Sequence, residues 1–131
     1  MRSFPWSGLS AYTHVTVNPI TLQVEVCGPM RQWRKADLLS YGTAEQIYLL
    51  LRIALADHLT GNHDTCPLIL DDVTVHADHA RTRDILDLLL KIAAHRQVIL
   101  FSQEEQVAAW ARENLDSPDH AIHTLQPLAS G

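Results

Sequence analysis

The chain has 131 residues, of which 47% are apolar and 19% are charged, and this composition suits one folded domain and excludes a disordered chain. Fifteen acidic against ten basic residues give a formal net charge of −5, which argues against a free-standing nucleic-acid binder with a basic patch. Two cysteines cannot form a disulfide framework, and we find no signal peptide or apolar run long enough to cross a membrane. We therefore expect a reducing, cytoplasmic location and no membrane partner.

The first part of the chain predicts a β-hairpin. Residues 1–11 show no periodicity and predict a flexible lead-in, so that residues 12–131 form the folded lobe. Apolar and polar residues alternate over 14–17 and again over 21–26, with Asn18-Pro19 as a turn between them. The segment 31–38 is compatible with either a third edge strand or a loop.

The remaining chain alternates between apolar strands and helical patterns. The first helix is expected to begin near Thr43, to end at Gly61-Asn62 and to be largely buried, because its sequence is apolar almost all round. The strands that follow this helix, over 67–70 and 97–101, are continuous apolar runs and should be buried on both faces of a sheet, as in parallel sheets. The elements predicted after this helix are strands over 67–70, 97–101 and 121–125 and helices over 78–94 and 104–114. This order predicts an α/β fold with a mostly parallel sheet, flanking helices and an N-terminal β-hairpin.

A first candidate site lies where the first helix begins. Ser40, Gly42 and Thr43 precede or open this helix, and free N–H groups at a helix N-terminus favour phosphate. Glycine permits close approach of the backbone, and Ser40 adds a hydroxyl donor. A Ser-x-Gly-Thr turn is most often an ordinary helix cap, so both interpretations stay open at this point.

A second candidate site is the pair Asp71-Asp72 at the end of the strand over 67–70. Ligands of open α/β sheets bind at the carboxyl ends of the strands. One carboxylate there suits Mg²⁺, and the other suits a water-activating base. The alternative is a pair of loop aspartates, one of which caps the following turn.

Four segments occur in an order that is typical of one family of ATPases. Residues 39–49 (LSYGTAEQIYL) resemble its signature motif and residues 67–72 (PLILDD) its Walker B motif. Residues 75–78 fall at the place of its D-loop, and residues 97–102 resemble the strand that leads to its switch histidine. Over about residues 12–125, the chain therefore resembles the C-terminal lobe of an ABC-type ATPase head from the SMC-like group. This group includes SMC, RecN and SbcC proteins, and the resemblance is closest to the YhaN-like AAA ATPases.

The resemblance implies ATP and Mg²⁺ as cofactors of the assembled head and a role for each matched residue. Asp71 would hold Mg²⁺ through water, Asp72 would polarise the attacking water, and Gln103 would take the switch position. Ser40 and Gly42 would face the γ-phosphate of a nucleotide on the opposite head, and Asp78 would contact that head. The residues implied at the nucleotide are Ser40, Gly42, Thr43 and Asp78.

Three departures from the family pattern matter for function. No Gly-x-x-x-x-Gly-Lys-Ser/Thr motif occurs, so the phosphate loop must come from an N-terminal lobe, on the same or a separate chain. Ser102-Gln103-Glu104 stands where the family has its switch histidine, so Gln103 or Glu104 takes that place. Asp72 stands where Glu is more usual. We therefore expect the isolated chain to be inactive and to need both a Walker A lobe and a second head.

Two other functions remain open. The chain is also compatible with a non-catalytic interaction module that pairs with an ATPase lobe, or with a small phosphohydrolase that uses Asp71 and Asp72. DNA repair, chromosome maintenance or defence follows from the family alone, and any contact with DNA would be made by the full-length protein. His76-x-x-His79 and His120-x-x-His123 lack further ligands at zinc-motif spacing, so we expect no zinc site.

Overall fold

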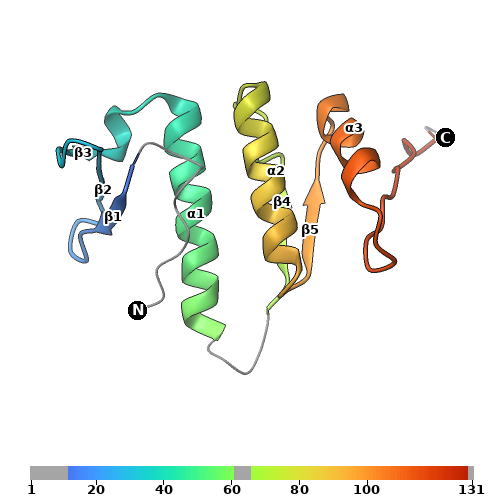
Figure 1. Ribbon diagram of the computed structural model, residues 1–131, viewed down its shortest axis with the longest axis horizontal. Coiled ribbons are helices and arrows are strands. Elements are labelled where there is room, and N and C mark those ends of the chain that lie inside the picture. The colour runs from blue at the N-terminus through green and yellow to red at the C-terminus, as the bar shows by residue number, and fades with distance from the viewer. Residues whose placement is uncertain (1–11, 61–65, 130–131) are drawn as a thin grey trace.

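The computed structural model describes residues 12–60 and 66–129, and the predicted lead-in over 1–11 and the Gly61-Asn62 stop lie outside these residues. Two small sheets and three α-helices make up the described part of the chain (Figure 1). The elements are β1 (His14–Val17), β2 (Val24–Cys27), β3 (Trp33–Lys35), the 3₁₀-helix η1 (Ala36–Leu38), α1 (Tyr41–Thr60), β4 (Leu68–Asp71), α2 (His79–Ala93), β5 (Val98–Phe101) and α3 (Glu105–Asn114).

The N-terminal sheet confirms the predicted hairpin and adds a third strand. It is antiparallel in the order β1-β2-β3. The turn between β1 and β2 is held by Asn18, whose Oδ1 accepts hydrogen bonds from two backbone N–H groups. Val24 and Val26 in the middle strand are buried and pack against Ile47 of α1, so this sheet is anchored to the first helix.

The parallel sheet is smaller than predicted. It contains β4 and β5 in register from Leu68 opposite Val98 to Asp71 opposite Phe101, and among the described residues neither strand pairs with a third one. Residues 121–125 form no strand. The prediction of a mostly parallel sheet is therefore wrong in extent, because three of the five strands described are antiparallel.

Burial on both faces of this sheet was also a wrong expectation. Leu68 and Leu70 point into the core, where α2 covers them. The opposite face is open: Ile69 is 65% exposed and Phe101 is 46% exposed. The side chains alternate along each strand, so every second residue of these apolar strands faces outward with nothing described to cover it.

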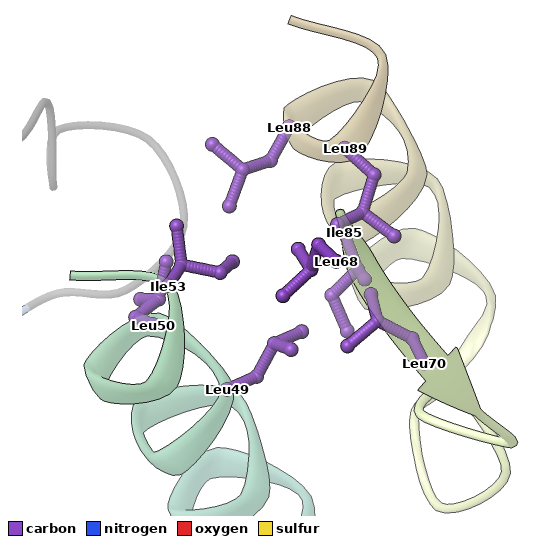
Figure 2. Close-up of a cluster of buried hydrophobic side chains, with 8 residues drawn as sticks. All are labelled: Leu49, Leu50, Ile53, Leu68, Leu70, Ile85, Leu88 and Leu89. Atoms are coloured by element: carbon purple, nitrogen blue, oxygen red, sulfur yellow. The ribbon is translucent and has the colours of Figure 1, made fainter. Parts of the chain in front are cut away.

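One apolar cluster joins α1, β4 and α2 (Figure 2). Its members are buried leucine and isoleucine side chains that meet between the two helices and the strand, and they belong to three consecutive elements. They are Leu49, Leu50 and Ile53 from α1, Leu68 and Leu70 from β4, and Ile85, Leu88 and Leu89 from α2. This cluster sets the position of α1 relative to the parallel sheet.

The first helix packs on two sides, with Ile47 against the N-terminal sheet and Leu50 in the cluster with β4 and α2, but it is not largely buried as expected. Tyr48, Leu55 and Leu59 are exposed on the side away from the cluster. The Tyr48 hydroxyl donates a hydrogen bond to Asp37 Oδ1 at 3.0 Å, and this bond raises the pKa of Tyr48. The apolar residues of this helix therefore serve two packed faces, and a third face, with Tyr48, Leu55 and Leu59, is not covered by described residues.

The third helix is anchored to α2 by a tryptophan. Trp110 is buried with Val107 against Leu86 of α2. Its indole N–H donates to Asp87 Oδ1 at 3.1 Å, so the polar atom of this large side chain has a partner.

No helix among the described residues is long and apolar enough to cross a membrane.

The cluster predicts a sharp difference between two leucines of α1. Leu50 is 2% exposed and Leu55 is 56% exposed. Leu50→Ala should lower the free energy of unfolding by about 2–5 kcal/mol, because it removes buried methyl groups and leaves a cavity. Leu55→Ala is the matched control and should change it by less than about 0.5 kcal/mol. Urea unfolding measures both, and equal effects would contradict the assigned burial.

Candidate functional site

The chemically interesting residues lie at one end of the molecule. Helices α1 and α2 begin there, and β4 and β5 end there, at the top in Figure 1. Helix N-termini and the carboxyl ends of parallel strands are both places where anionic ligands bind in α/β proteins. The fold thus brings the two sequence segments singled out above to the same end.

The segment predicted to be a signature motif, residues 39–49, includes the first turn of α1, here called the signature turn. The helix begins at Tyr41, two residues before the predicted start near Thr43. Ser40 precedes it, is exposed, and places its Oγ 2.7 Å from Thr43 Oγ1. Because the first N–H groups of a helix have no partner within the helix, this turn presents backbone donors together with two hydroxyls.

Gly42 lies against the backbone of the loop that follows β4. A Cβ atom at this position would be 2.9 Å from the carbonyl oxygen of His76, closer than real contacts allow. Beside it, the Tyr41 and His76 rings meet edge to face with their centroids 4.6 Å apart. The signature turn and the loop therefore touch directly, a contact between neighbouring motifs that sequence spacing does not reveal.

The electrostatics of this turn are modest. A hydrogen bond from the Tyr41 hydroxyl to the Glu45 carboxylate, together with that negative charge, raises the pKa of Tyr41. The Tyr41 phenol therefore keeps its proton at neutral pH and remains a hydrogen-bond donor.

The two aspartates occupy different backbone conformations. Asp71 is the last residue of β4, lies opposite Phe101 and is exposed. Asp72 is half-buried and adopts φ 49°, in the left-handed region that few residues other than Gly, Asn and Asp tolerate. Its N–H donates to the Phe101 carbonyl at 2.9 Å, which extends the β4–β5 pairing by one residue. The left-handed turn directs the chain away from the sheet immediately after the carboxylate pair.

The segment after β5 separates the two candidates for the switch position. Gln103 is exposed, and no described residue contacts its side chain through a hydrogen bond. Glu104 is half-buried, and its Oε2 accepts a hydrogen bond from the hydroxyl of Thr74. The Gln103 side chain is therefore free to contact a ligand, whereas the Glu104 carboxylate already accepts a hydrogen bond from Thr74.

Asp78 caps α2. Its carboxylate accepts a hydrogen bond from the Arg81 backbone N–H at 2.9 Å and lies 3.7 Å from Arg81 Nε. The residue is exposed, so the cap explains its presence without a ligand, and a contact with a second head stays a prediction.

The donor set at this end of the molecule fits a hard cation only in part. Asp71 offers an exposed carboxylate of the kind Mg²⁺ binds, usually with waters and phosphate oxygens as its other ligands. Among residues 12–60 and 66–129, no group of three or more His, Cys, Asp and Glu side chains is arranged to hold a metal ion. A dedicated metal cage built from this part of the chain is thus not present, whereas a shared Mg²⁺–nucleotide site fits the donors.

The close approach at Gly42 predicts that alanine is not tolerated there. Gly42→Ala should lower the free energy of unfolding by about 1–2 kcal/mol, because the cost of overpacking exceeds the gain of about 1 kcal/mol in helix propensity. Urea unfolding measures this change. Arg81→Ala in the Gly42→Ala background is the control, because the Arg81 guanidinium is the other group near the new methyl group. Full recovery in that double variant would contradict a clash with the His76 carbonyl.

No family model matches the chain. A curated relative, the uncharacterised protein YhaN of Bacillus subtilis, is 38% identical over 73 residues, which are 55% of this chain and 8% of that protein. The chain thus spans a small part of the length of this relative.

Solved SMC ATPase heads have the same fold. One structure, from work on ATP-driven dimerisation and DNA-stimulated activation of SMC ATPases, has a TM-score of 0.58 at 15% identity and covers 73% of this chain and 59% of its own. Another, an SMC head domain with an extended coiled coil bound to the C-terminal domain of ScpA from Pyrococcus furiosus, has a TM-score of 0.54 at 17% identity. It covers 73% of this chain and 25% of its own. The chain therefore has the fold of part of an SMC ATPase head and is similar in sequence to a segment of YhaN.

Proposed function

We propose that this chain is the C-terminal lobe of an SMC-like ATPase head, which contributes a signature motif and a Walker B motif to ATP hydrolysis between two heads. The observation that supports this proposal best is the direct contact between the turn at Gly42 and the loop after Asp71-Asp72, at the end of the molecule where α1 and α2 begin. In a head dimer the signature motif and the Walker B motif of one lobe act on different nucleotides. In this chain the segments proposed for these two motifs touch each other.

The proposed chemistry divides between the two motifs. Asp71 would hold the Mg²⁺ that accompanies the nucleotide, and bound Mg²⁺ would supply positive charge to neutralise the phosphates. The Asp72 carboxylate orients and polarises the attacking water. Gln103, whose amide is free, occupies the switch position near the γ-phosphate, and an amide avoids the repulsion that the Glu104 carboxylate would meet there.

The signature turn serves the nucleotide of the opposite head. Ser40 and Thr43 supply hydroxyl donors, Gly42 lets the backbone approach the γ-phosphate, and the N–H groups of the first turn of α1 point toward the same anion. Asp78, at the start of α2, contacts the second head in this arrangement. These roles follow the family pattern and agree with the exposure of Ser40 and Asp78.

A Walker A lobe is the partner that the open sheet suggests. The sequence contains no phosphate loop. The outer face of β4 and β5 exposes Ile69, Ile99 and Phe101, and such apolar surface on a sheet is normally covered by another layer. An N-terminal lobe that covers this face would supply the missing phosphate contacts as well. Roles in DNA repair, chromosome maintenance or defence, and contact with DNA, would belong to the full-length protein.

A non-catalytic interaction module is the second candidate. The observation that favours it is the absence of histidine at residue 103, since the switch histidine normally senses the γ-phosphate. In that case the lobe would pair with an ATPase lobe and engage nucleotide without hydrolysis. A self-sufficient phosphohydrolase is less well supported, because the described residues add no third metal ligand to the two aspartates.

Asp72→Asn tests the catalytic form of the proposal in the ATPase assembled with its Walker A lobe. Asparagine also tolerates the left-handed backbone at this position, so the fold should be kept. Hydrolysis should fall by roughly two to four powers of ten, as for a lost general base, and ATP binding should survive. A phosphate-release assay measures the rate, and turnover at the parent rate would overturn the role of Asp72.

Ser40→Arg is the companion variant with a different expected failure. The nucleotide should still bind its own head, but the bulky side chain should block engagement of the second head. Sedimentation with ATP separates the two cases: Asp72→Asn should accumulate engaged dimers, and Ser40→Arg should give none. A parent assembly that forms ATP-dependent dimers without hydrolysis would favour the interaction module instead.

A further inference from the structure

We propose that Glu104 is a positioning residue, which acts through Thr74 to hold the turn that presents Asp72. This inference rests on the proposed function, since it concerns how the water-polarising carboxylate is oriented. The supporting observation is a side-chain hydrogen bond from Thr74 Oγ1 to Glu104 Oε2, between residues thirty positions apart in sequence.

The turn after β4 is fixed on one side by the sheet. Asp72 donates its N–H to the Phe101 carbonyl at 2.9 Å, and its own carbonyl accepts from Val75 N–H at 3.3 Å. Thr74 continues this turn, since its carbonyl accepts from Ala77 N–H at 2.9 Å. These bonds define the path of the main chain, but all of them except the bond to Phe101 are local to the turn.

Thr74 provides the second attachment. Its side chain is completely buried, with 0% exposure, so its hydroxyl needs a partner within the protein. The Glu104 carboxylate is that partner. The turn is therefore tied to the end of β5 through the Phe101 carbonyl and to the start of α3 through Glu104.

Glu104 is placed for this task and not for capping its own helix. It is the N-cap residue of α3, yet its side chain makes no capping hydrogen bond. Its backbone N–H donates to Ser102 Oγ at 3.1 Å, which orients the residue immediately after Gln103. A glutamate at an N-cap contributes little to helix stability, so its use here agrees with a long-range contact.

Two consequences follow for the site. Asp72 holds a left-handed conformation that is costly unless its surroundings fix it, and the Thr74–Glu104 bond is one of those constraints. The same bond links the turn that bears Asp72 to the segment that bears Gln103.

Steady-state kinetics of the assembled ATPase test the inference. Thr74→Val keeps the shape of the buried side chain and removes the donor, and Glu104→Ala removes the acceptor. Each should lower kcat roughly ten- to a hundredfold, the cost of a misplaced catalytic group, with the KM for ATP changed less than about twofold. The double variant should be no slower than the slower single variant, because the two changes remove one interaction.

Two controls separate positioning from general damage. Glu104→Gln retains an amide oxygen that accepts the bond and should restore kcat to within about threefold of the parent. Glu105→Ala removes the same charge from the next residue, where Glu105 pairs with Arg112 at 3.0 Å on the exposed side of α3, and should leave kcat unchanged. Additive losses, or an equal loss in Glu105→Ala, would overturn the inference.

Amide hydrogen exchange of the assembled protein without ATP gives an independent readout. Peptides over residues 72–75 should exchange faster in both Thr74→Val and Glu104→Ala and at the parent rate in Glu105→Ala. If the parent hydrolyses no ATP, the proposed function fails, while the exchange result still decides whether this bond holds the turn. Unchanged exchange in Thr74→Val and Glu104→Ala would show that it does not.

Discussion

The apolar packing of α1 on β4 and α2 is the interaction on which the candidate site depends. Leu50 and Ile53 of α1 meet Leu68 of β4 in the interior, and this contact places the start of α1 beside the end of the strand. Without it, the signature turn and the aspartate pair would belong to separate surfaces. The close contact of Gly42 with His76 then fixes the two motifs relative to each other at short range.

The two-stranded parallel sheet brings the candidate site residues to one edge, but its outer face is not covered by any described residue. Two strands place Asp71, Asp72 and Gln103 at one edge, but the outer face of these strands exposes Ile69 and Phe101. Apolar residues on both faces are typical of strands from the middle of a sheet. The sequence of β4 and β5 thus fits a position within a larger assembly, in agreement with a fold shared with part of an SMC head.

Local patterns were sufficient to predict most elements, because capping and periodicity act over a few residues. The predicted helix over 78–94 is α2, with Asp78 as its cap, and the predicted helix over 104–114 is α3. The strand predicted over 121–125 failed because an alternating pattern needs a neighbouring strand to pair with, and none is described there. The expectation that β4 and β5 are buried on both faces was wrong for a related reason: apolar residues in a strand do not show whether the layer that covers them belongs to the described residues.

The finer features of the site depend on contacts between distant segments, which a single sequence does not encode in any local pattern. The left-handed conformation of Asp72 and the bond between Thr74 and Glu104 belong to this class. The sequence offered Gln103 or Glu104 for the switch position, and the resemblance implied Gln103. The occupied carboxylate of Glu104 favours Gln103, whose assignment, like those of Ser40 and Asp71, remains a proposal.

The most direct measurement is a calorimetric titration of Mg²⁺-ATP into the isolated chain and into the chain combined with its Walker A lobe. The backbone N–H groups and the lysine of a phosphate loop supply most contacts to a triphosphate, and this chain has no such loop. The isolated chain should therefore show no binding in the micromolar range, and the combination should bind. Micromolar affinity in the isolated chain would contradict the account, because it would require a complete nucleotide site within this lobe.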